Sequence, residues 1–216
     1  MPITVYGMNA SPVVRGTLMA VEALGLEFER IEVNTMLGDQ FKPEFLKLNP
    51  LHTIPTIQDG DFVIWDSHAI NSYLVDKYGK DDSFYPKDLQ KRAVINQRLY
   101  FDCVLFPKIL AVFSSIKNEA VSVRKDLADP LVEAYTSLET LLARSTYAAG
   151  EQVTIADFSL VATISSANVV VPVESSRFPR TTEWLTKMQD LPYYHAGNQV
   201  GLDRLIAAVK NKFTSL

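Results

Sequence analysis

The sequence lacks the residue patterns that mark several large protein classes. Its 216 residues include one cysteine, Cys103, so no disulfide can form within the chain and a reducing, cytosolic setting fits. The 21 lysine and arginine residues form no basic cluster and face 25 acidic residues, which argues against nucleic-acid binding. There is no P-loop and no GxGxxG motif, so nothing supports nucleotide phosphate binding.

Metal-ligand and membrane patterns are also missing. The three histidines and the one cysteine are widely scattered, so we expect no metal cofactor. We find no signal segment at the N-terminus and no apolar run of about 18 residues, so we expect no membrane span. The whole chain is 47% hydrophobic and 21% charged, an ordinary composition for a globular chain of one or two domains.

Strand and helix patterns alternate at the start of the chain. Residues 2–7 and 28–34 alternate apolar and polar side chains, which predicts two strands. Between them, Ser11-Pro12 places a good N-cap before a proline at the first helical position, and helical spacing continues to Gly25. Because a helix links these strands, we expect them to pair in parallel.

The next segments complete a first domain. They predict a short helix, two strands and a longer helix, at residues 44–48, 55–58, 62–65 and 66–78. Asp59-Gly60 is a hairpin turn signal, and Asp66 or Ser67 caps the longer helix. This order of elements is that of a thioredoxin-like α/β domain, which we place at residues 1–80.

The start of the first helix is where such domains usually carry their chemistry, because free N–H groups and the helix dipole favour an anion there. Ser11 occupies this position, and no cysteine lies within the first 100 residues. Thiol–disulfide exchange by this domain is therefore excluded.

A polar, turn-rich stretch at residues 80–86 marks the domain boundary, and we see no convincing strand beyond it. We expect an all-helical domain over residues 88–216, with helices at 88–117, 126–144, from 155, at 179–190 and at 201–213. Thr154 and Asp157 form a capping box. The helix that follows is apolar nearly all round, which predicts the buried centre of this domain.

Four segments together resemble the cytosolic glutathione transferases: Ser11 at the helix start, NPLHTIPT at 49–56, DSHAI at 66–70 and TIADFS at 154–159. The resemblance covers essentially the whole chain. In detail it is to the insect delta and epsilon classes, and more to epsilon.

The resemblance implies a cytoplasmic homodimer with an active site between the two domains of each subunit. The implied reaction is attack by the thiolate of the co-substrate glutathione on a small hydrophobic electrophile, without a metal. The corresponding role is detoxification, with insecticide-type substrates. Dehydrochlorinase, peroxidase or isomerase side activities are also implied.

Ser11 is the implied catalytic residue, through a hydrogen bond from its hydroxyl to the glutathione sulfur. Lowering a thiol pKa by about two units requires roughly 2.7 kcal/mol of preference for the thiolate. A hydrogen bond to a charged acceptor supplies about 1.5–3 kcal/mol, and a helix N-terminus adds about 0.3–1 kcal/mol. No general base is needed. Without the resemblance, Ser11 is a plain helix cap.

The resemblance also assigns the glutathione-binding residues. They are Ser11, Gln40, His52, Thr53, Ile54, Pro55, Asp66, Ser67 and His68. His52 and Gln40 are placed at the glycine carboxylate, and Ile54 pairs through its backbone before a cis Pro55. Asp66 takes the γ-glutamyl ammonium and Ser67 its carboxylate.

This chain departs from the family pattern at three places. Gln40 stands where many relatives have a second histidine. His68 stands where the delta class usually has arginine, so the donation of His68 to the ligand depends on the charge of its ring. The segment at 101–106 lacks a family glycine.

The expected electrophile pocket is apolar. For each of its candidate residues, an ordinary place in the hydrophobic core is an equally good interpretation. Its candidates are Met8, Met36, Leu37, Phe106, Ile109, Leu110 and Phe113. Cys103 is expected to be a buried small hydrophobe.

Two other functions remain open from the sequence. One is a carrier of hydrophobic ligands with little turnover, although such a carrier has no need for a complete thiolate site. The other is a structural or interaction module. We see no appended domain or charged tail that would support this function.

Overall fold

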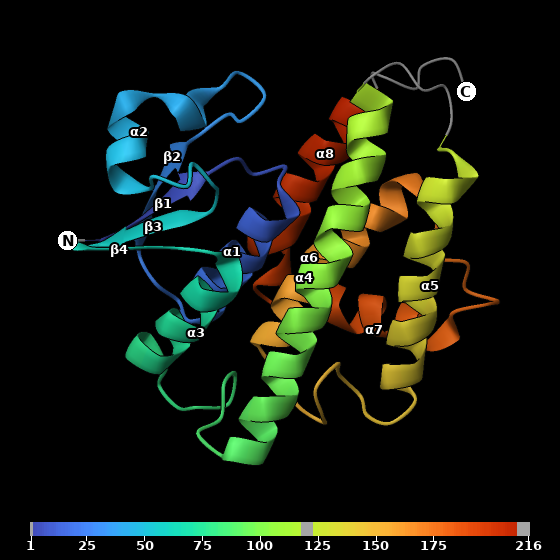
Figure 1. The fold of residues 1–216 in the computed structure, drawn as a ribbon. Helices are drawn as coiled ribbons and strands as arrows, with labels where there is room; N and C mark the ends of the chain where they lie inside the picture. The colour runs from blue at the N-terminus through green and yellow to red at the C-terminus, as the bar shows by residue number, and fades with distance from the viewer. Residues whose placement is uncertain (1, 118–122, 211–216) are drawn as a thin grey trace.

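The computed structural model describes residues 2–117 and 123–210, which form two lobes side by side (Figure 1). The first lobe contains four strands and three α-helices. They are β1 (Ile3–Gly7), α1 (Pro12–Ala23), β2 (Phe28–Glu32), α2 (Pro43–Leu48), β3 (Thr56–Asp59), β4 (Phe62–Trp65) and α3 (Ser67–Tyr78). A 3₁₀ turn, η1 (Asp39–Phe41), precedes α2.

The sheet has the order β2-β1-β3-β4. Strand β1 pairs with β2 in parallel, and β3 pairs with both β1 and β4 in antiparallel fashion. The β3–β4 turn uses Gly60 at φ 63°, a conformation that glycine adopts without cost. The predicted thioredoxin-like arrangement is thus confirmed, with β2 two residues shorter than expected.

The second lobe is helical. It contains α4 (Leu89–Lys117), α5 (Lys125–Leu142), α6 (Ile155–Val170), α7 (Pro179–Gln189), the π-helical turn η2 (His195–Gln199) and α8 (Val200–Lys210). Within the described part of this lobe there is no strand, only an isolated bridge between Tyr147 and Gly150. The predicted last helix is confirmed up to Lys210, and its residues 211–213 lie outside the described part.

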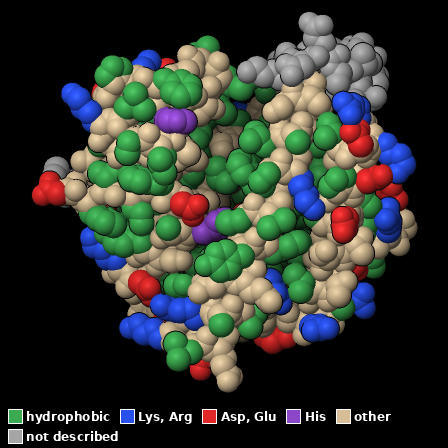
Figure 2. All heavy atoms as spheres, in the orientation of Figure 1, with side chains coloured by type: hydrophobic (Ala, Val, Ile, Leu, Met, Phe, Trp, Pro, Cys, Tyr) green, Lys and Arg blue, Asp and Glu red, His purple; other side chains and the backbone are tan. Residues whose placement is uncertain are grey.

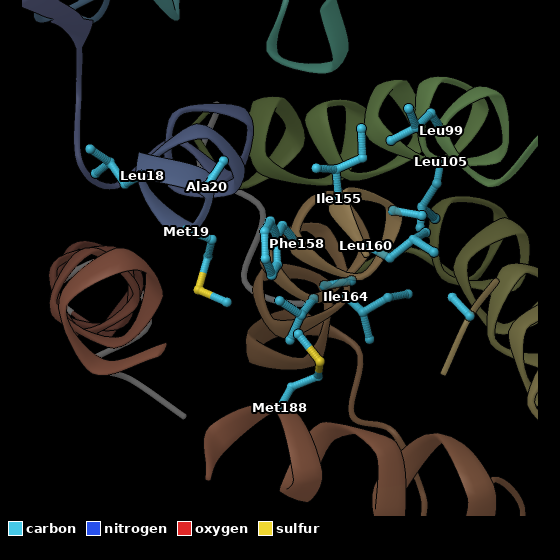
Figure 3. Packing of buried hydrophobic residues seen from close by; sticks show 14 of the residues in the cluster. Leu18, Met19, Ala20, Leu99, Leu105, Ile155, Phe158, Leu160, Ile164 and Met188 are labelled. Carbon is cyan, nitrogen blue, oxygen red and sulfur yellow. The ribbon is translucent and has the colours of Figure 1, made fainter. Parts of the chain in front are cut away.

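Helix α6 is the centre of the helical lobe, as its all-round apolar pattern predicts. Figure 3 shows Phe158 and Ile164 of α6 between side chains of α1, α4 and α7. The Asp157 carboxylate is fully buried and accepts hydrogen bonds from Thr154 N (2.9 Å), Ala148 N (2.8 Å) and Trp184 Nε1 (3.0 Å). The bond from Thr154 is the reciprocal bond of the predicted capping box.

The two lobes meet where α1 packs on α6 and on the segment before α8. A Cβ added at Gly16 of α1 would lie 3.3 Å from the Cα of Ser159 in α6. A Cβ added at Gly201 would lie only 2.2 Å from the carbonyl oxygen of Asn9, in the loop before α1. The absence of side chains at these points lets α1 lie directly on the helical lobe, which fixes the position of its N-terminus.

Helix α4 corrects one expectation. Residues 89–116 are long and apolar enough to cross a membrane by length and composition, with a mean hydropathy of 1.6 over an 18-residue window. In the structure, 33% of that window is buried. Leu105, Ile109 and Val112 of α4 are buried and belong to the main hydrophobic core.

Asp59, at the end of β3, ties the hairpin to α3. Its Oδ2 accepts hydrogen bonds from Tyr73 Oη (2.6 Å), Lys77 Nζ (2.7 Å) and Tyr78 Oη (2.7 Å). Burial by itself would raise the pKa of Asp59, but these three donors and the charge of Lys77 lower that pKa to about 2. The carboxylate form is therefore favoured in the folded protein.

We predict an acid-sensitive step in stability from Asp59. Because its folded pKa lies below the ordinary value, its contribution is complete above about pH 4 and is lost as the pH falls toward about 2. Urea unfolding midpoints between these pH values measure the effect. Asp59→Asn should flatten the curve, and Tyr73→Phe should flatten it partly. An unchanged slope in Asp59→Asn would contradict this assignment.

Candidate active site

Ser11 lies at the N-terminus of α1, with Pro12 at the first helical position. Its backbone is extended (φ −72°, ψ 126°), and its side chain makes no capping hydrogen bond to the helix. Its own N–H donates to Met8 O at 2.9 Å. The hydroxyl therefore has no structural bond in the helix and lies beside the positive end of the helix dipole, where an anion is stabilised.

The loop between α2 and β3 is held by Asn49, whose role the sequence reasoning missed. Asn49 is fully buried, and its Nδ2 lies 3.0 Å from Thr53 O, from Thr53 Oγ1 and from Thr56 Oγ1. Its Oδ1 accepts from Leu51 N at 2.9 Å. The signal available in the sequence was a single asparagine before Pro50, which is also the pattern of an ordinary turn.

The Asn49 network sets the shape of the residues that follow. His52 is exposed, takes a left-handed backbone conformation (φ 48°), and its ring lies 4.9 Å from the Phe41 ring. Gln40, in the neighbouring η1 turn, approaches Thr35 O through Nε2 at 3.5 Å. The Ile54–Pro55 peptide bond is cis, as the resemblance implied.

Asp66 caps α3 from a left-handed backbone position. At φ 73° and ψ 117° its conformation costs about 1–3 kcal/mol for a residue other than glycine. Its Oδ1 accepts from His68 N at 2.9 Å and from Ala69 N at 3.2 Å, which holds this conformation. The carboxylate is still 58% exposed, while Ser67 is buried at the first helical position. A charged acceptor and a helix N-terminus thus lie side by side.

His68 is directed toward the other lobe. Its Nε2 lies 2.9 Å from Asp102 Oδ2 of α4, and its Nδ1 lies 3.3 Å from Cys103 Sγ. Burial by itself would lower the pKa of His68, but the bond to Asp102 and the charges of Asp102 and Asp66 raise it. Because both ring nitrogens face protein atoms, the expected donation from the His68 ring to a ligand is corrected to a contact between lobes.

Cys103 also corrects an expectation, because it is exposed and not buried. Partial burial raises the pKa of its thiol, and Asp66 and Asp102 raise it further. The neutral thiol is thus the favoured form beside His68 Nδ1.

The residues expected to form the electrophile pocket divide by exposure. Met36, Leu37 and Leu110 are exposed, at 59%, 79% and 53%, and Met8, Phe106 and Phe113 are half-buried. Ile109 has no exposed surface and belongs to the core, so we remove it from the pocket set. Figure 2 shows a hollow between the lobes with hydrophobic side chains along its rims.

A large cavity lies elsewhere in the described part of the structure. It has a volume of about 780 Å³ and is formed by the ends of α5, α6, α7 and α8, with Val169, Leu202 and Ile206 among its lining residues. Ser11 does not line it.

Comparison with known proteins agrees with this geometry. Residues 1–76 match the family model for the glutathione S-transferase N-terminal domain, and residues 100–192 match that for the C-terminal domain. The chain belongs to the glutathione S-transferase family.

Individual relatives cover nearly the whole chain. Glutathione S-transferase 1 of Manduca sexta is 39% identical, over 99% of this chain and 100% of that protein. An epsilon-class glutathione S-transferase structure from the housefly, Musca domestica, superposes with a TM-score of 0.93 at 43% identity, over 97% of this chain and 98% of that one. A glutathione transferase homologue from Drosophila mojavensis, solved with bound glutathione, also gives a TM-score of 0.93 at 43% identity, with 98% and 97% covered. Named transferases at this identity support an enzyme, and the resemblance to the epsilon class is confirmed.

We predict that Asn49→Ala changes substrate affinity more than turnover. The change leaves several buried polar groups of the loop without a partner and should destabilise the fold by about 2–4 kcal/mol. The loop should then position His52 and Ile54 less well, which raises KM for glutathione several-fold. Steady-state kinetics with unfolding curves measure both effects. A loss confined to kcat would show that Asn49 does not act through this loop.

Proposed function

We propose that this protein conjugates the glutathione thiolate to small hydrophobic electrophiles, with Ser11 as the residue that stabilises the thiolate. The observation that carries the proposal is the Ser11 hydroxyl, which makes no capping bond although it stands at the N-terminus of α1. The hydroxyl is therefore available to donate to a thiolate. Together with the helix N-terminus, it supplies enough stabilisation to lower a thiol pKa by about two units.

The other groups fit the remaining parts of glutathione. The exposed Asp66 carboxylate suits the γ-glutamyl ammonium, and Ser67, at the first position of α3 and beside the positive end of its helix dipole, suits the neighbouring carboxylate. Ile54 offers its backbone to the cysteinyl part. We assign His52 and Gln40 to the glycine carboxylate, with Thr53 and Pro55 as further contacts from the same loop as His52.

The electrophile would lie against apolar side chains from both lobes. Met36 and Leu37 of the first lobe and Leu110 of α4 carry the exposed apolar surface for it. Phe106, Phe113 and Met8 can extend that surface. We infer detoxification of foreign hydrophobic compounds as the role, with elimination, peroxidase or isomerase reactions available to the same thiolate.

We further propose a cytoplasmic homodimer. Tyr100 and Val104 on α4 are 72% and 62% exposed, which is apolar surface that a second subunit would cover. The domain limits of 1–80 and 88–216 remain part of this proposal.

A second candidate is a carrier of hydrophobic ligands with little turnover. It is favoured by the 780 Å³ cavity among the helices, which lies away from Ser11. Turnover separates the two candidates, because a carrier binds without conjugating.

We predict that Ser11→Ala loses at least about tenfold in kcat/KM for conjugation of glutathione to a chlorodinitrobenzene-type electrophile, equivalent to roughly 1.4 kcal/mol at the transition state. Because the hydroxyl makes no capping bond, the variant should lose less stability than the ~1 kcal/mol typical of a lost N-cap. Ser11→Thr, which keeps a hydroxyl, is the matched control. A fully active alanine variant would show that the Ser11 hydroxyl does not stabilise the thiolate.

A further inference from the structure

Arg15 is a buried cation one helical turn beyond Ser11. Its backbone N–H donates to the Ser11 carbonyl oxygen at 3.0 Å, and its side chain has no exposed surface. Side chains of a helix lean toward its N-terminus. The Arg15 side chain therefore starts over the turn that begins at Ser11. A Cβ added at Gly201 would meet both Asn9 O (2.2 Å) and Arg15 Cδ (2.6 Å), which places the arginine side chain next to the loop before Ser11.

The guanidinium of Arg15 crosses into the helical lobe, where its partners are all neutral. NH1 donates to Asn198 Oδ1 at 2.6 Å and to Ser165 Oγ at 3.4 Å. NH2 donates to Ala162 O at 3.1 Å and to Ser166 Oγ. Nε has no hydrogen-bond partner in the described part of the chain.

No carboxylate among the described residues lies within 4.0 Å of this guanidinium, since it takes part in none of their ion pairs. Buried charges are ordinarily paired, because an unpaired charge is costly in a medium of low dielectric constant. Burial lowers the pKa of Arg15 to about 9, so the group still carries its charge at neutral pH. The protein therefore holds an uncompensated positive charge beneath the start of α1.

Asn198 makes two side-chain hydrogen bonds here, because its Oδ1 accepts from Arg15 and its Nδ2 donates to Ser165 Oγ at 3.3 Å. It joins the lobes without neutralising the guanidinium, whereas an aspartate of the same shape would pair with the charge. An uncompensated charge has a different effect. It stabilises an anion nearby, and its field is weakly screened inside the protein.

We propose that Arg15 is a positioning residue for the proposed reaction: its unpaired buried charge lowers the pKa of the glutathione thiol held at Ser11. This inference rests on the proposed function. Arg15 does not touch the sulfur and acts through the electrostatic potential at the N-terminus of α1.

Two titratable groups near Arg15 bear on this effect. Tyr194, between α7 and η2, is buried, and burial raises its pKa, so it stays neutral in the working range. Asp203 of α8 is exposed and acts on Tyr194. The neighbouring side chains from α6 are the hydroxyls of Ser165 and Ser166, which do not titrate there.

The decisive variant is Asn198→Asp. It keeps the shape and the acceptor for NH1 but places a negative charge against the guanidinium, which cancels the field. The Nδ2 donor to Ser165 Oγ is lost, but the Ser165 hydroxyl can rotate to donate to the new carboxylate. We expect the pKa of enzyme-bound glutathione, followed by thiolate absorbance against pH, to rise by about 0.5–1 unit. The matched control is Asn168→Asp, which adds the same charge at an exposed position of α6 and should leave the thiol pKa unchanged.

A purely structural role for Arg15 predicts an unchanged thiol pKa, because the new charge pair would then affect only the contact between the lobes. A folded Asn198→Asp with wild-type thiol pKa would overturn the inference. If that variant does not fold, Arg15→Lys and Arg15→Met decide. The charged lysine variant should keep the thiol pKa within about 0.3 unit of wild type and the neutral methionine variant should raise it, and equal values in both would overturn the inference.

The wild-type measurement separates the two levels of the argument. If wild-type protein binds glutathione without lowering its thiol pKa, the proposed function itself fails. If the wild type lowers the pKa and Asn198→Asp does not change it, only the role of Arg15 fails.

Discussion

The packing of α1 against α6 is the contact on which the rest of the structure depends. Helix α1 follows β1 in the sheet lobe, but Gly16 brings it onto the backbone of Ser159 at the centre of the helical lobe. This close contact places Ser11, at the start of α1, near the boundary between the lobes. A helix held only by the sheet would leave its N-terminus free to shift relative to α4.

Buried polar residues stabilise the segments that this contact leaves irregular. Asn49 holds the loop before β3, and Asp157 joins the segment before α6 to Trp184 of α7. Each satisfies several backbone groups that no helix or sheet can serve. Such residues fix one loop conformation, which is what a binding site built from loops requires.

The sequence predicted most of the architecture because it depends on local signals. Ser11-Pro12, Asp59-Gly60 and the capping box at Asp157 each act within a few residues, so strand order, helix starts and the thioredoxin-like sheet followed from the pattern. The family motifs then located the loop around Pro55. These features needed no knowledge of which elements meet.

Three of the corrected expectations concern contacts between elements. Nothing near His68 in the sequence indicates that its ring faces Asp102, 34 residues later. The helical spacing on α4 identified an apolar face, but it could not tell that Ile109 is core while Leu110 is exposed. Cys103 was judged by residue type alone. The packing of the two lobes decides each of these cases, and the periodicity of one helix carries no information about that packing.

The loop that carries Met36 and Leu37 is stabilised within itself. Asn34 N donates to Asp39 Oδ2 at 2.9 Å, and Met36 N donates to Asn34 Oδ1 at 3.0 Å. These bonds leave the two apolar side chains outside the core, so exchanging them disturbs neither the sheet nor α1. Natural variation can therefore change this exposed apolar surface while the structure around Ser11 stays unchanged, so on the proposed function substrate range can evolve separately from reactivity.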